Sequence, residues 1–241
     1  MKPHKPKCLN ENIVIIDGLT RSGKFYLGKL MSGIKGLEYF INSSEIERII
    51  IAGLTGITSK TDASALMATA INEKIYNLAI GRNINLRPDD SSSILNSFEK
   101  KYYLTRQQGQ SGWGAVQKIL DNSRYSVFVF HQSLQALKII KDAIPKPLII
   151  NLRRHPVELV FSWAQRGWGH RYGSDPLAFE PIFQHGDSFV PYFATDWGDE
   201  YLKGNEYDRI VKSVIRLTEK ESSVIDNNKG EFCHVYYDNL V

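Results

Sequence analysis

The sequence predicts an α/β fold with a central parallel β-sheet flanked by helices, arranged as a three-layer sandwich. The first observation is that short apolar runs alternate with segments of helical character, an order that places helices on both faces of a parallel sheet. The second is composition, because 42% of the residues are hydrophobic and 23% are charged, as in ordinary folded globular proteins. The third is length, since 241 residues suit one sizeable domain over residues 1–241.

Four apolar runs have the length and the β-branched character of buried strands. These predicted strands are Asn12–Asp17 (NIVIID), Tyr125–Phe130 (YSVFVF), Leu148–Leu152 (LIINL) and Phe232–Tyr237 (FCHVYY). A further short strand is predicted near Leu37–Ile41.

Helices are predicted between these strands. The first covers about Lys24 to Ser32, the region of about 44–122 forms a mostly helical insertion, and another helix runs from Glu206 to Ile225. A helix is also expected to begin at Pro156, because proline suits the first helical turn. The aromatic stretch from Gly167 to Gly204, rich in glycine and proline, is predicted to be a long ordered loop.

Charge and cysteine content exclude several classes of protein. Lysine and arginine total 30 against 26 for aspartate and glutamate, a net charge of +4 without a long basic tract, so nucleic acid is not an expected partner. Cys8 and Cys233 belong to no disulfide framework or metal-binding cluster. With neither a signal peptide nor an uncharged run of roughly 18 residues, the protein is expected to be soluble and cytoplasmic. Residues 1–11, with lysines at positions 2, 5 and 7, are expected to form a flexible tail.

The turn after the first strand has the composition of an anion-binding loop. Its glycines let backbone N–H groups face an anion, and the following helix adds free N–H groups and a positive dipole end. Arg21 and Lys24 are expected to place two cations at the mouth of this loop. The spacing from Gly18 to Lys24 satisfies GxxxxGK, the phosphate-binding loop of nucleotide triphosphatases, but Phe25 stands where that motif needs a hydroxyl for Mg²⁺. The alternative interpretation is a glycine turn that carries exposed basic residues.

A second anion-binding pattern follows the strand predicted at 148–152. Arg154 is expected at the C-terminal end of that strand, where ligands bind in open α/β sheets, and a guanidinium there can hold a phosphate through two hydrogen bonds. Ser162 lies two turns along the next helix, so its hydroxyl offers a second contact. Taken alone, this pair is explained equally well as two surface residues.

Together the two segments resemble the sulfotransferase family that uses 3′-phosphoadenosine 5′-phosphosulfate (PAPS) and has a fold similar to that of the P-loop NTPases. LTRSGKFYL looks like the family's 5′-phosphosulfate loop, and RHPVELVFS looks like its 3′-phosphate motif. FVFHQSL occupies the place of the strand that carries the family's catalytic histidine, and HVYYDNLV is similar to the family's YEDL strand. The four matches come in the family's order and span residues 12–241.

The resemblance implies a role for each matching residue. Arg21 takes the place of the basic residue that binds the 5′-phosphate and steadies the leaving group, and His131 falls on the general base. Arg154 and Ser162 fall on the pair that holds the 3′-phosphate. The other cofactor-binding positions of the loop are Ser22, Gly23, Lys24 and Phe25. The reserve candidates for the base are two carboxylates of the helical region, Glu47 and Asp62.

The resemblance also implies an activity, the transfer of a sulfuryl group from PAPS to a hydroxyl or amine of a small-molecule or carbohydrate acceptor, without a metal. Sulfuryl transfer is an in-line displacement, so positioning and charge stabilisation should supply most of the catalysis. The alternatives are a P-loop kinase or nucleotide triphosphatase, and a non-catalytic nucleotide-binding relative.

Three features depart from the family pattern. Lys24 and Phe25 replace small hydroxyl residues in the loop. About 110 residues separate Arg21 from His131, which leaves room for helices that shape an acceptor pocket. The chain stops at Val241, where many members continue, so we expect either a different cover for the adenosine or a truncated chain. Most aromatic residues between positions 163 and 197 are expected to pack against one another, while a subset forms an aromatic wall of the site for the acceptor or the adenine.

Overall fold

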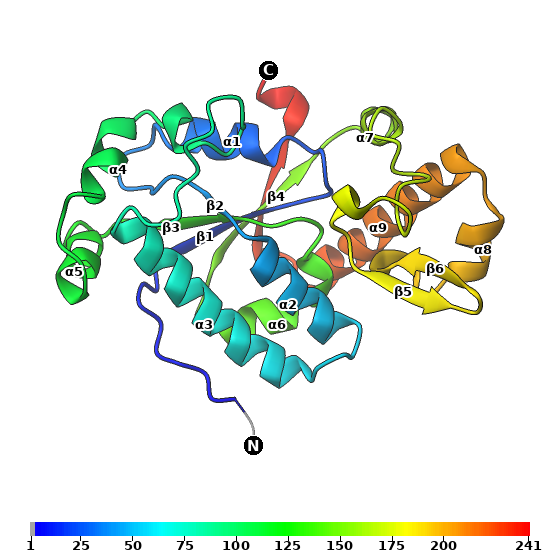
Figure 1. Cartoon of the computed structure of the whole chain (residues 1–241), viewed down its shortest axis with the longest axis horizontal. Helices are drawn as coiled ribbons and strands as arrows, with labels where there is room; N and C mark the ends of the chain where they lie inside the picture. Colours follow the sequence, from blue (N-terminus) through cyan, green and yellow to red (C-terminus); the bar gives the residue numbers. More distant parts are fainter. Residues whose placement is uncertain (1–2) are drawn as a thin grey trace.

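Five parallel strands form the centre of the molecule, and helices cover both faces of this sheet (Figure 1). The computed structural model describes residues 3–241, and residues 1 and 2 of the predicted tail lie outside the described part. The strands pair in the order β2-β3-β1-β4-β7. Their bounds are β1 Ile13–Asp17, β2 Ile41–Asn42, β3 Ser126–Val129, β4 Leu148–Arg153 and β7 Phe232–Tyr236.

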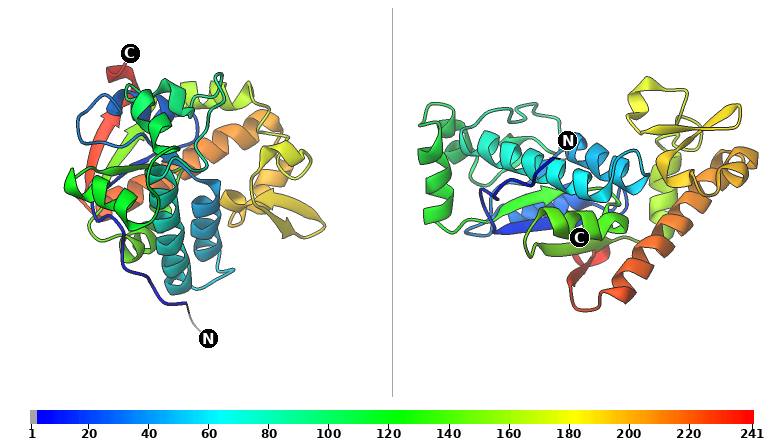
Figure 2. Two further views of the ribbon diagram at one scale, coloured as in Figure 1. Left: turned by 60° about the vertical axis from the view of Figure 1, so that its left-hand side comes forward. Right: turned by 90° about the horizontal axis from the view of Figure 1, so that it is seen from below.

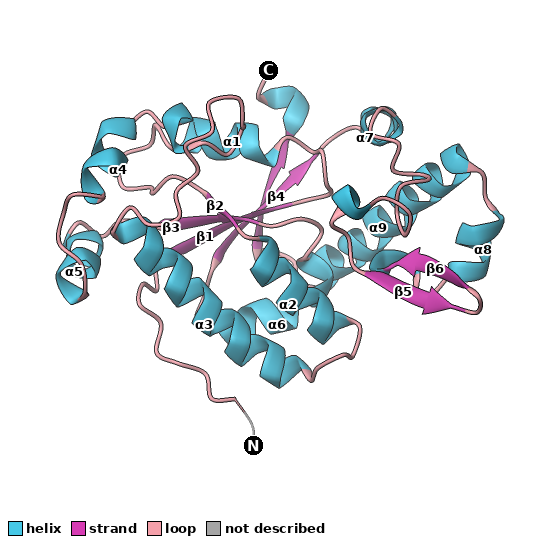
Figure 3. Cartoon of the chain, viewed as in Figure 1, coloured by secondary structure: helices cyan, strands magenta, loops and turns pink. Residues whose placement is uncertain are grey.

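Figure 3 shows the helices on either side of the sheet, and this arrangement confirms the predicted fold class. Between β1 and β3 the helices are α1 Lys24–Met31, α2 Ser44–Leu54, α3 Lys60–Ala79, α4 Lys100–Arg106 and α5 Trp113–Asp121. After β3 they are α6 Leu137–Ala143, α7 Pro156–Ala164, α8 Gly198–Lys203 and α9 Glu206–Asn227. Within residues 3–241, no helix is both long enough and apolar enough to span a bilayer.

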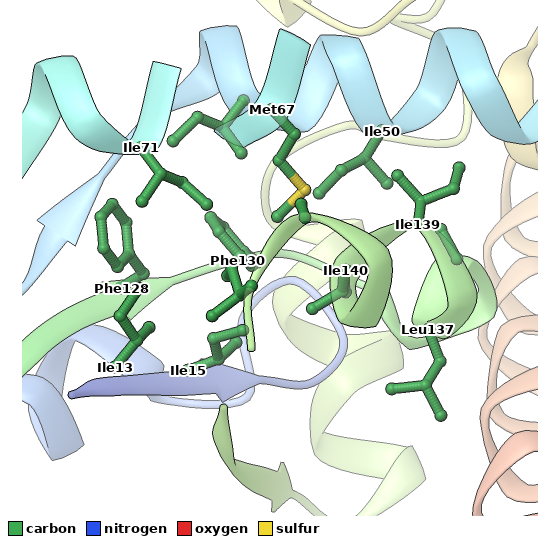
Figure 4. Close-up of a cluster of buried hydrophobic side chains, with 14 of the residues drawn as sticks. Ile13, Ile15, Ile50, Met67, Ile71, Phe128, Phe130, Leu137, Ile139 and Ile140 are labelled. Carbon is green, nitrogen blue, oxygen red and sulfur yellow. The ribbon is translucent and has the colours of Figure 1, made fainter. Parts of the chain in front are cut away.

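Successive residues of β1 point to opposite faces of the sheet, and a different set of helices closes each face. Ile13 and Ile15 pack with residues of α2, α3 and α6 in one buried cluster, part of which Figure 4 shows. Val14 and Ile16 belong to a second buried cluster, which includes residues of α1 and α4. Apolar burial on both sides therefore fixes the strand that leads into the glycine loop.

A third buried cluster joins α7 and α9 beside the sheet. An antiparallel hairpin, formed by β5 Ile182–His185 and β6 Ser188–Pro191, projects from this end together with α8 (Figure 2). The prediction of a long loop over 167–204 is therefore wrong for these segments. The hairpin forms because Phe183 and Val190 are cross-strand partners whose side chains both pack into the third cluster.

β2 is shorter than the strand predicted at Leu37–Ile41. The strand itself covers Ile41–Asn42, and Leu37 makes only an isolated parallel bridge to Tyr125. The ladder is interrupted because the backbone N–H of Tyr39 donates to the hydroxyl of Tyr103, at 2.7 Å, rather than to β3. The other predicted strands and helices agree with the structure to within about two residues at each end.

The C-terminal ends of β1, β3 and β4 meet at one edge of the sheet. From β1 the chain moves outward to β2, returns to β3 and then crosses to β4 on the other side of β1. Such a reversal leaves a crevice outside the strand ends, where α/β proteins bind ligands. The glycine loop, His131 and Arg154 all follow these strand ends.

Candidate functional site

The loop between β1 and α1 is a tight turn that packs against the segment after β7. Ser22 N donates to Leu19 O at 3.1 Å, which closes the turn. Gly23 has φ 98°, and a Cβ at this position would lie 2.4 Å from the ring of Tyr237. Arg21 also has a positive φ, 73°, a conformation that costs a non-glycine residue energy and persists only where its surroundings impose it. The absence of a side chain at Gly23 therefore permits Tyr237 to pack closely against the loop.

Lys24 supports this loop from inside, whereas its sequence position had predicted a cation at the mouth. The side chain is buried, and Nζ donates to Gly18 O at 2.8 Å and to Leu19 O at 2.7 Å. Because C=O and N–H point in opposite directions across a trans peptide, these bonds turn the N–H groups of Leu19 and Thr20 away from Lys24. Burial lowers the pKa of Lys24 to about 8, although the Asp17 carboxylate acts in the opposite direction.

The first turn of α1 offers further N–H groups. The first helical hydrogen bond runs from Leu27 N to Gly23 O, so the N–H groups of Lys24, Phe25 and Tyr26 precede it. No side chain among the described residues caps this end of the helix. Free N–H groups at the positive end of a helix dipole attract negative charge, so the loop and the helix together favour an anion.

Three arginines gather beside the loop. Arg21 Nε donates to Ser162 Oγ at 3.0 Å, and Arg154 donates to Arg21 O at 3.1 Å. Burial lowers the pKa of Arg21, and the neighbouring charges of Arg166 and Arg154 lower it further. The only acidic group of residues 3–241 in an ion pair with any of the three is Glu158, which lies 2.6 Å from Arg154. The cluster thus carries an excess of positive charge that an anion would relieve.

These arginines line a cleft of about 360 Å³, which we call the arginine cleft. Its walls also contain the first turn of α1, and Arg154 lies with its guanidinium 4.5 Å from the centre of the Tyr237 ring. The sequence-predicted residues in its lining are Arg21, Gly23, Lys24, Phe25, His131 and Arg154. The volume and the excess of cations suit a ligand with more than one phosphate-like group.

A second cleft of about 210 Å³ adjoins the first, and we call it the aromatic pocket. The two share Thr20, His131 and Trp168 as lining residues. Its remaining walls come from Gln132 and Ser133 after β3, from α2 and from the segment after α7, which includes Tyr172 and Tyr192. His131 therefore borders both clefts and can contact a group bound in either of them.

His131 is paired with Glu47, one of the two reserve candidates for the base. Glu47 Oε1 lies 2.7 Å from His131 Nδ1 and also accepts from His131 N at 3.0 Å. Since an ionised carboxylate can only accept, Nδ1 carries the proton and Nε2 keeps its lone pair. Burial and the Lys24 ammonium lower the pKa of His131, while Glu47 raises it. The imidazole is therefore neutral at pH 7 and able to take a proton.

The carboxylate of Asp17 is directed into the fold. Asp17 is buried, and Ser133 donates to its carboxylate from both N and Oγ. Burial raises the pKa of Asp17 to about 6, against hydrogen bonds from Ser133 and the charge of Lys24. Among residues 3–241 no three His, Cys, Asp or Glu side chains gather in a way that could hold a metal ion. The loop thus has neither the hydroxyl nor the nearby free carboxylate that a bound Mg²⁺ uses in P-loop nucleotide triphosphatases.

Three sequence-predicted residues lie apart from the cleft linings. Ser22 and Ser162 are buried, and Ser162 accepts from Arg21 instead of facing the arginine cleft. Asp62, the other reserve base, lies in the first turn of α3 and lines neither cleft. The structure therefore separates the two reserve candidates and leaves Glu47 beside His131.

Sequence reasoning missed Arg166 and Tyr237 as parts of this site. Arg166 follows α7 and lines the arginine cleft, and Tyr237 follows β7 and covers both Gly23 and Arg154. For Tyr237 a signal was present, because it lies in HVYYDNLV, one of the four segments that resemble the family. Arg166 stands in no such segment, and only the turn after α7 brings it to the cleft.

Two solved structures to which the chain is similar are sulfotransferase domains. One comes from the curacin biosynthetic pathway, with a TM-score of 0.47 and 12% identity over 98% of this chain and 69% of that domain's chain. The other comes from the Synechococcus PCC 7002 olefin synthase, with a TM-score of 0.47 and 13% identity over 100% of this chain and 71% of that chain. Comparison with protein-family models and with curated proteins finds no match.

Proposed function

We propose that the protein is a PAPS-dependent sulfotransferase that acts on a hydroxyl or amine acceptor. The observation that carries this proposal is the junction of the two clefts. An arginine-lined cleft meets an aromatic pocket at His131, whose imidazole is oriented by Glu47 and kept neutral by burial and by Lys24. A nucleotide with two anionic groups suits the first cleft, a small acceptor suits the second, and a base stands between them.

In this proposal the arginine cleft holds the nucleotide. Arg21 and the free N–H groups of the loop and α1 bind the 5′-phosphosulfate, and Arg154 binds the 3′-phosphate. Ser162 acts by accepting from Arg21 Nε, which keeps that guanidinium in place. Because Lys24 occupies the carbonyl side of the loop, the opposite side is left to the anion. The residues present therefore suit a doubly anionic nucleotide without a metal.

His131 acts as the base in this proposal, and the bound donor supplies the sulfuryl group. The acceptor hydroxyl gives its proton to His131 Nε2 as the acceptor oxygen bonds to sulfur and the bond from sulfur to the 5′-phosphate oxygen breaks. Glu47 stabilises the imidazolium that results, because its carboxylate accepts from Nδ1. Arg21 and the loop N–H groups stabilise the negative charge that develops on the departing phosphate.

The rival interpretation as a Mg²⁺-dependent kinase or nucleotide triphosphatase has less support. Phe25 leaves the loop without the hydroxyl ligand, Lys24 is held by loop carbonyls, and Asp17 is held by Ser133. A non-catalytic relative would need no base between two clefts, and the pairing of His131 with Glu47 favours an enzyme.

Calorimetry with 3′-phosphoadenosine 5′-phosphate (PAP), the product nucleotide, tests the proposal against the kinase alternative. We expect PAP to bind with the same affinity in EDTA and in Mg²⁺, because arginines and N–H groups hold its phosphates. ATP is expected to bind more weakly, since it lacks the 3′-phosphate that Arg154 recognises. Absence of PAP binding, or ATP binding that requires Mg²⁺, would contradict the proposal.

Replacing Glu47 with glutamine is expected to lower the pKa of His131 further. In the unaltered protein His131 should already titrate below 6.5, because burial and Lys24 disfavour its charged form, and Glu47 is the group that opposes them. NMR titration of the ring C–H signals measures this pKa without an acceptor. In the unaltered protein, activity should fall only at pH values below the ordinary histidine range, because a protonated His131 cannot act as a base. In Glu47→Gln this fall should move to still lower pH.

Asp62→Asn is the matched control, because Asp62 is also in the first turn of a helix but lines neither cleft. It should leave the titration of His131 unchanged. A rise of the His131 pKa in Glu47→Gln would show that the carboxylate does not face the imidazole.

A further inference from the structure

One carboxylate in the wall of the aromatic pocket, that of Glu180, is unpaired in the described part of the chain. Glu180 follows the short helical turn Pro176–Ala178, lines the pocket and is half-buried. Its carboxylate makes no hydrogen bond or ion pair with residues 3–241. Glu47, the other carboxylate of the pocket wall, already accepts from His131. A ligand in the pocket therefore meets Glu180 as a free acceptor.

The charge of Glu180 lies at the pocket, because the groups that it affects are all part of the pocket wall. Burial and the charge of Glu180 raise the pKa of Tyr172 and of Tyr192. Glu180 is in turn affected by the charges of Glu47 and Arg48, which belong to α2. All four groups line the aromatic pocket and come from separate parts of the chain. The carboxylate that acts on all of them is therefore directed toward the space they enclose.

The surroundings of Glu180 leave its negative charge uncompensated. Burial raises the pKa of Glu180 to about 7, the charge of Glu47 acts in the same direction, and Arg48 has the smallest effect of the three. Arg48 is exposed, so water screens its attraction to the carboxylate. An opposite charge close to a carboxylate favours its ionised form. A positively charged ligand would therefore stabilise Glu180, and Glu180 would stabilise the ligand.

The rest of the pocket wall suits an organic cation of small size. Trp168, Tyr172 and Tyr192 contribute aromatic rings, which attract a cation near their faces, and α2 contributes aliphatic side chains. Two carboxylates in the wall disfavour an anionic ligand. The volume of about 210 Å³ is below the usual range for small-molecule sites, about 300 to 1,000 Å³. The pocket therefore holds one ring or a short chain, with a positive charge at Glu180.

We propose that the aromatic pocket binds a small alcohol or phenol that carries a positively charged nitrogen, and that Glu180 recognises this nitrogen. The role of this ligand as the acceptor rests on the function proposed above, whereas its binding does not. A charged nitrogen has no lone pair, so the hydroxyl is the group that reacts. Its proton passes to His131 and its oxygen takes the sulfuryl group from the donor, while the nitrogen keeps its charge.

Saturation-transfer NMR with two pairs of ligands tests this proposal. Choline and 3,3-dimethylbutan-1-ol have the same shape and differ in the charge of one atom, as do 4-hydroxybenzylamine and 4-ethylphenol. We expect the charged member of at least one pair to bind about tenfold or more tightly than its neutral partner, because a hydrogen bond or contact to a charged group is lost in the neutral ligand. Neutral ligands that bind as tightly as the charged ones, or no binding of either charged ligand, would overturn the proposal.

Three variants identify the group that reads the charge. Glu180→Gln should weaken the charged ligand about tenfold and leave its neutral partner within about twofold. Asp187→Asn is the matched control, because Asp187 is an exposed carboxylate of the β5–β6 turn that lines neither cleft, and it should change neither affinity. Arg48→Ala should tighten the charged ligand about two- to fivefold, since it removes a like charge from the wall. Equal weakening of both ligands in Glu180→Gln would overturn the proposal.

The pH dependence of binding supplies a second readout. Choline keeps its charge at every pH, so its affinity should follow the ionisation of Glu180 and be about fourfold weaker at pH 6.5 than at pH 8. The other titratable groups around Glu180 keep one state over this range: Glu47, Arg48, His131, Tyr172 and Tyr192. Glu180→Gln should abolish the difference between the two pH values. A difference that persists in this variant would contradict the assignment of the charge to Glu180.

Calorimetry with PAP on the same preparation separates this proposal from the function on which part of it rests. Charged ligands that bind through Glu180 to a protein without affinity for PAP would support the pocket assignment and overturn the proposed sulfotransferase activity. Binding of PAP by a protein that shows no preference for charged ligands would overturn the pocket assignment alone.

Discussion

Replacing Arg154 with alanine is expected to weaken the binding of PAP about 10- to 100-fold, the loss of ~1.5–3 kcal/mol that follows when a hydrogen bond to a charged group is removed. Two contacts hold the Arg154 side chain in place, because it donates to Arg21 O and lies over the Tyr237 ring. Its guanidinium is the cation of the arginine cleft that the resemblance assigns to the 3′-phosphate. Calorimetry with PAP, and with adenosine 5′-phosphate as the ligand that lacks the 3′-phosphate, measures the effect.

Two further variants test whether the charge at Arg154, rather than any nearby charge, controls PAP affinity. Glu158→Gln should tighten PAP binding about two- to fivefold, because the Glu158 carboxylate occupies Arg154 Nε at 2.6 Å and repels a phosphate. Arg48→Ala removes the same charge from the aromatic pocket and should leave PAP affinity within about twofold. If Arg154→Ala weakens adenosine 5′-phosphate as much as PAP, Arg154 does not recognise the 3′-phosphate.

Replacing His131 with alanine is expected to slow sulfuryl transfer about 10²- to 10⁴-fold, the usual contribution of a general base. PAP affinity should change little, because the proposed function assigns the nucleotide to arginines and backbone N–H groups of the arginine cleft rather than to His131. Release of PAP from PAPS, measured with the best acceptor found in a panel of phenols and amino sugars, gives the rate. Calorimetry on the same preparation gives the affinity.

His170→Ala is the control for this variant. His170 is an exposed histidine paired with Glu206, and it lines neither cleft, so its removal should leave the rate unchanged. If His131→Ala kept the full rate, His131 would not be the base, and Glu47 would become the candidate. Loss of PAP binding together with the rate would instead assign His131 a structural role in the arginine cleft.

The fold was predictable because its strands and helices are local in the sequence. The apolar run of β1 is buried on both faces, and Pro156 begins α7 where its fixed φ suits a first helical turn. The hairpin of β5 and β6 was missed because its stability depends on tertiary contacts. Phe183 and Val190 are distant in sequence from the α7 and α9 residues they pack against. A local signal was present and went unused, because the two-residue loop Gly186-Asp187 is typical of a hairpin turn.

The candidate site was less predictable than the fold, because residue type does not give side-chain direction. The sequence placed Arg21, Lys24 and Arg154 near one sheet edge, but only the structure shows that Lys24 points back to the loop carbonyls. Glu47 could be named as a carboxylate of the helical region, yet its choice over Asp62 depends on how α2 packs beside β3. No sequence pattern indicated Arg166, because only the turn after α7 brings its side chain to the arginine cleft.

The packing of Tyr237 on Gly23 and Arg154 has a consequence for how the protein acquires its site. The glycine loop comes early in the chain, whereas Tyr237 comes directly after β7, which pairs with β4. Contacts between such distant segments require a long loop closure and form late in folding. During synthesis the glycine loop and α1 emerge long before the ring that covers them. Anion affinity should therefore arise at the final docking of β7, rather than with the early helices.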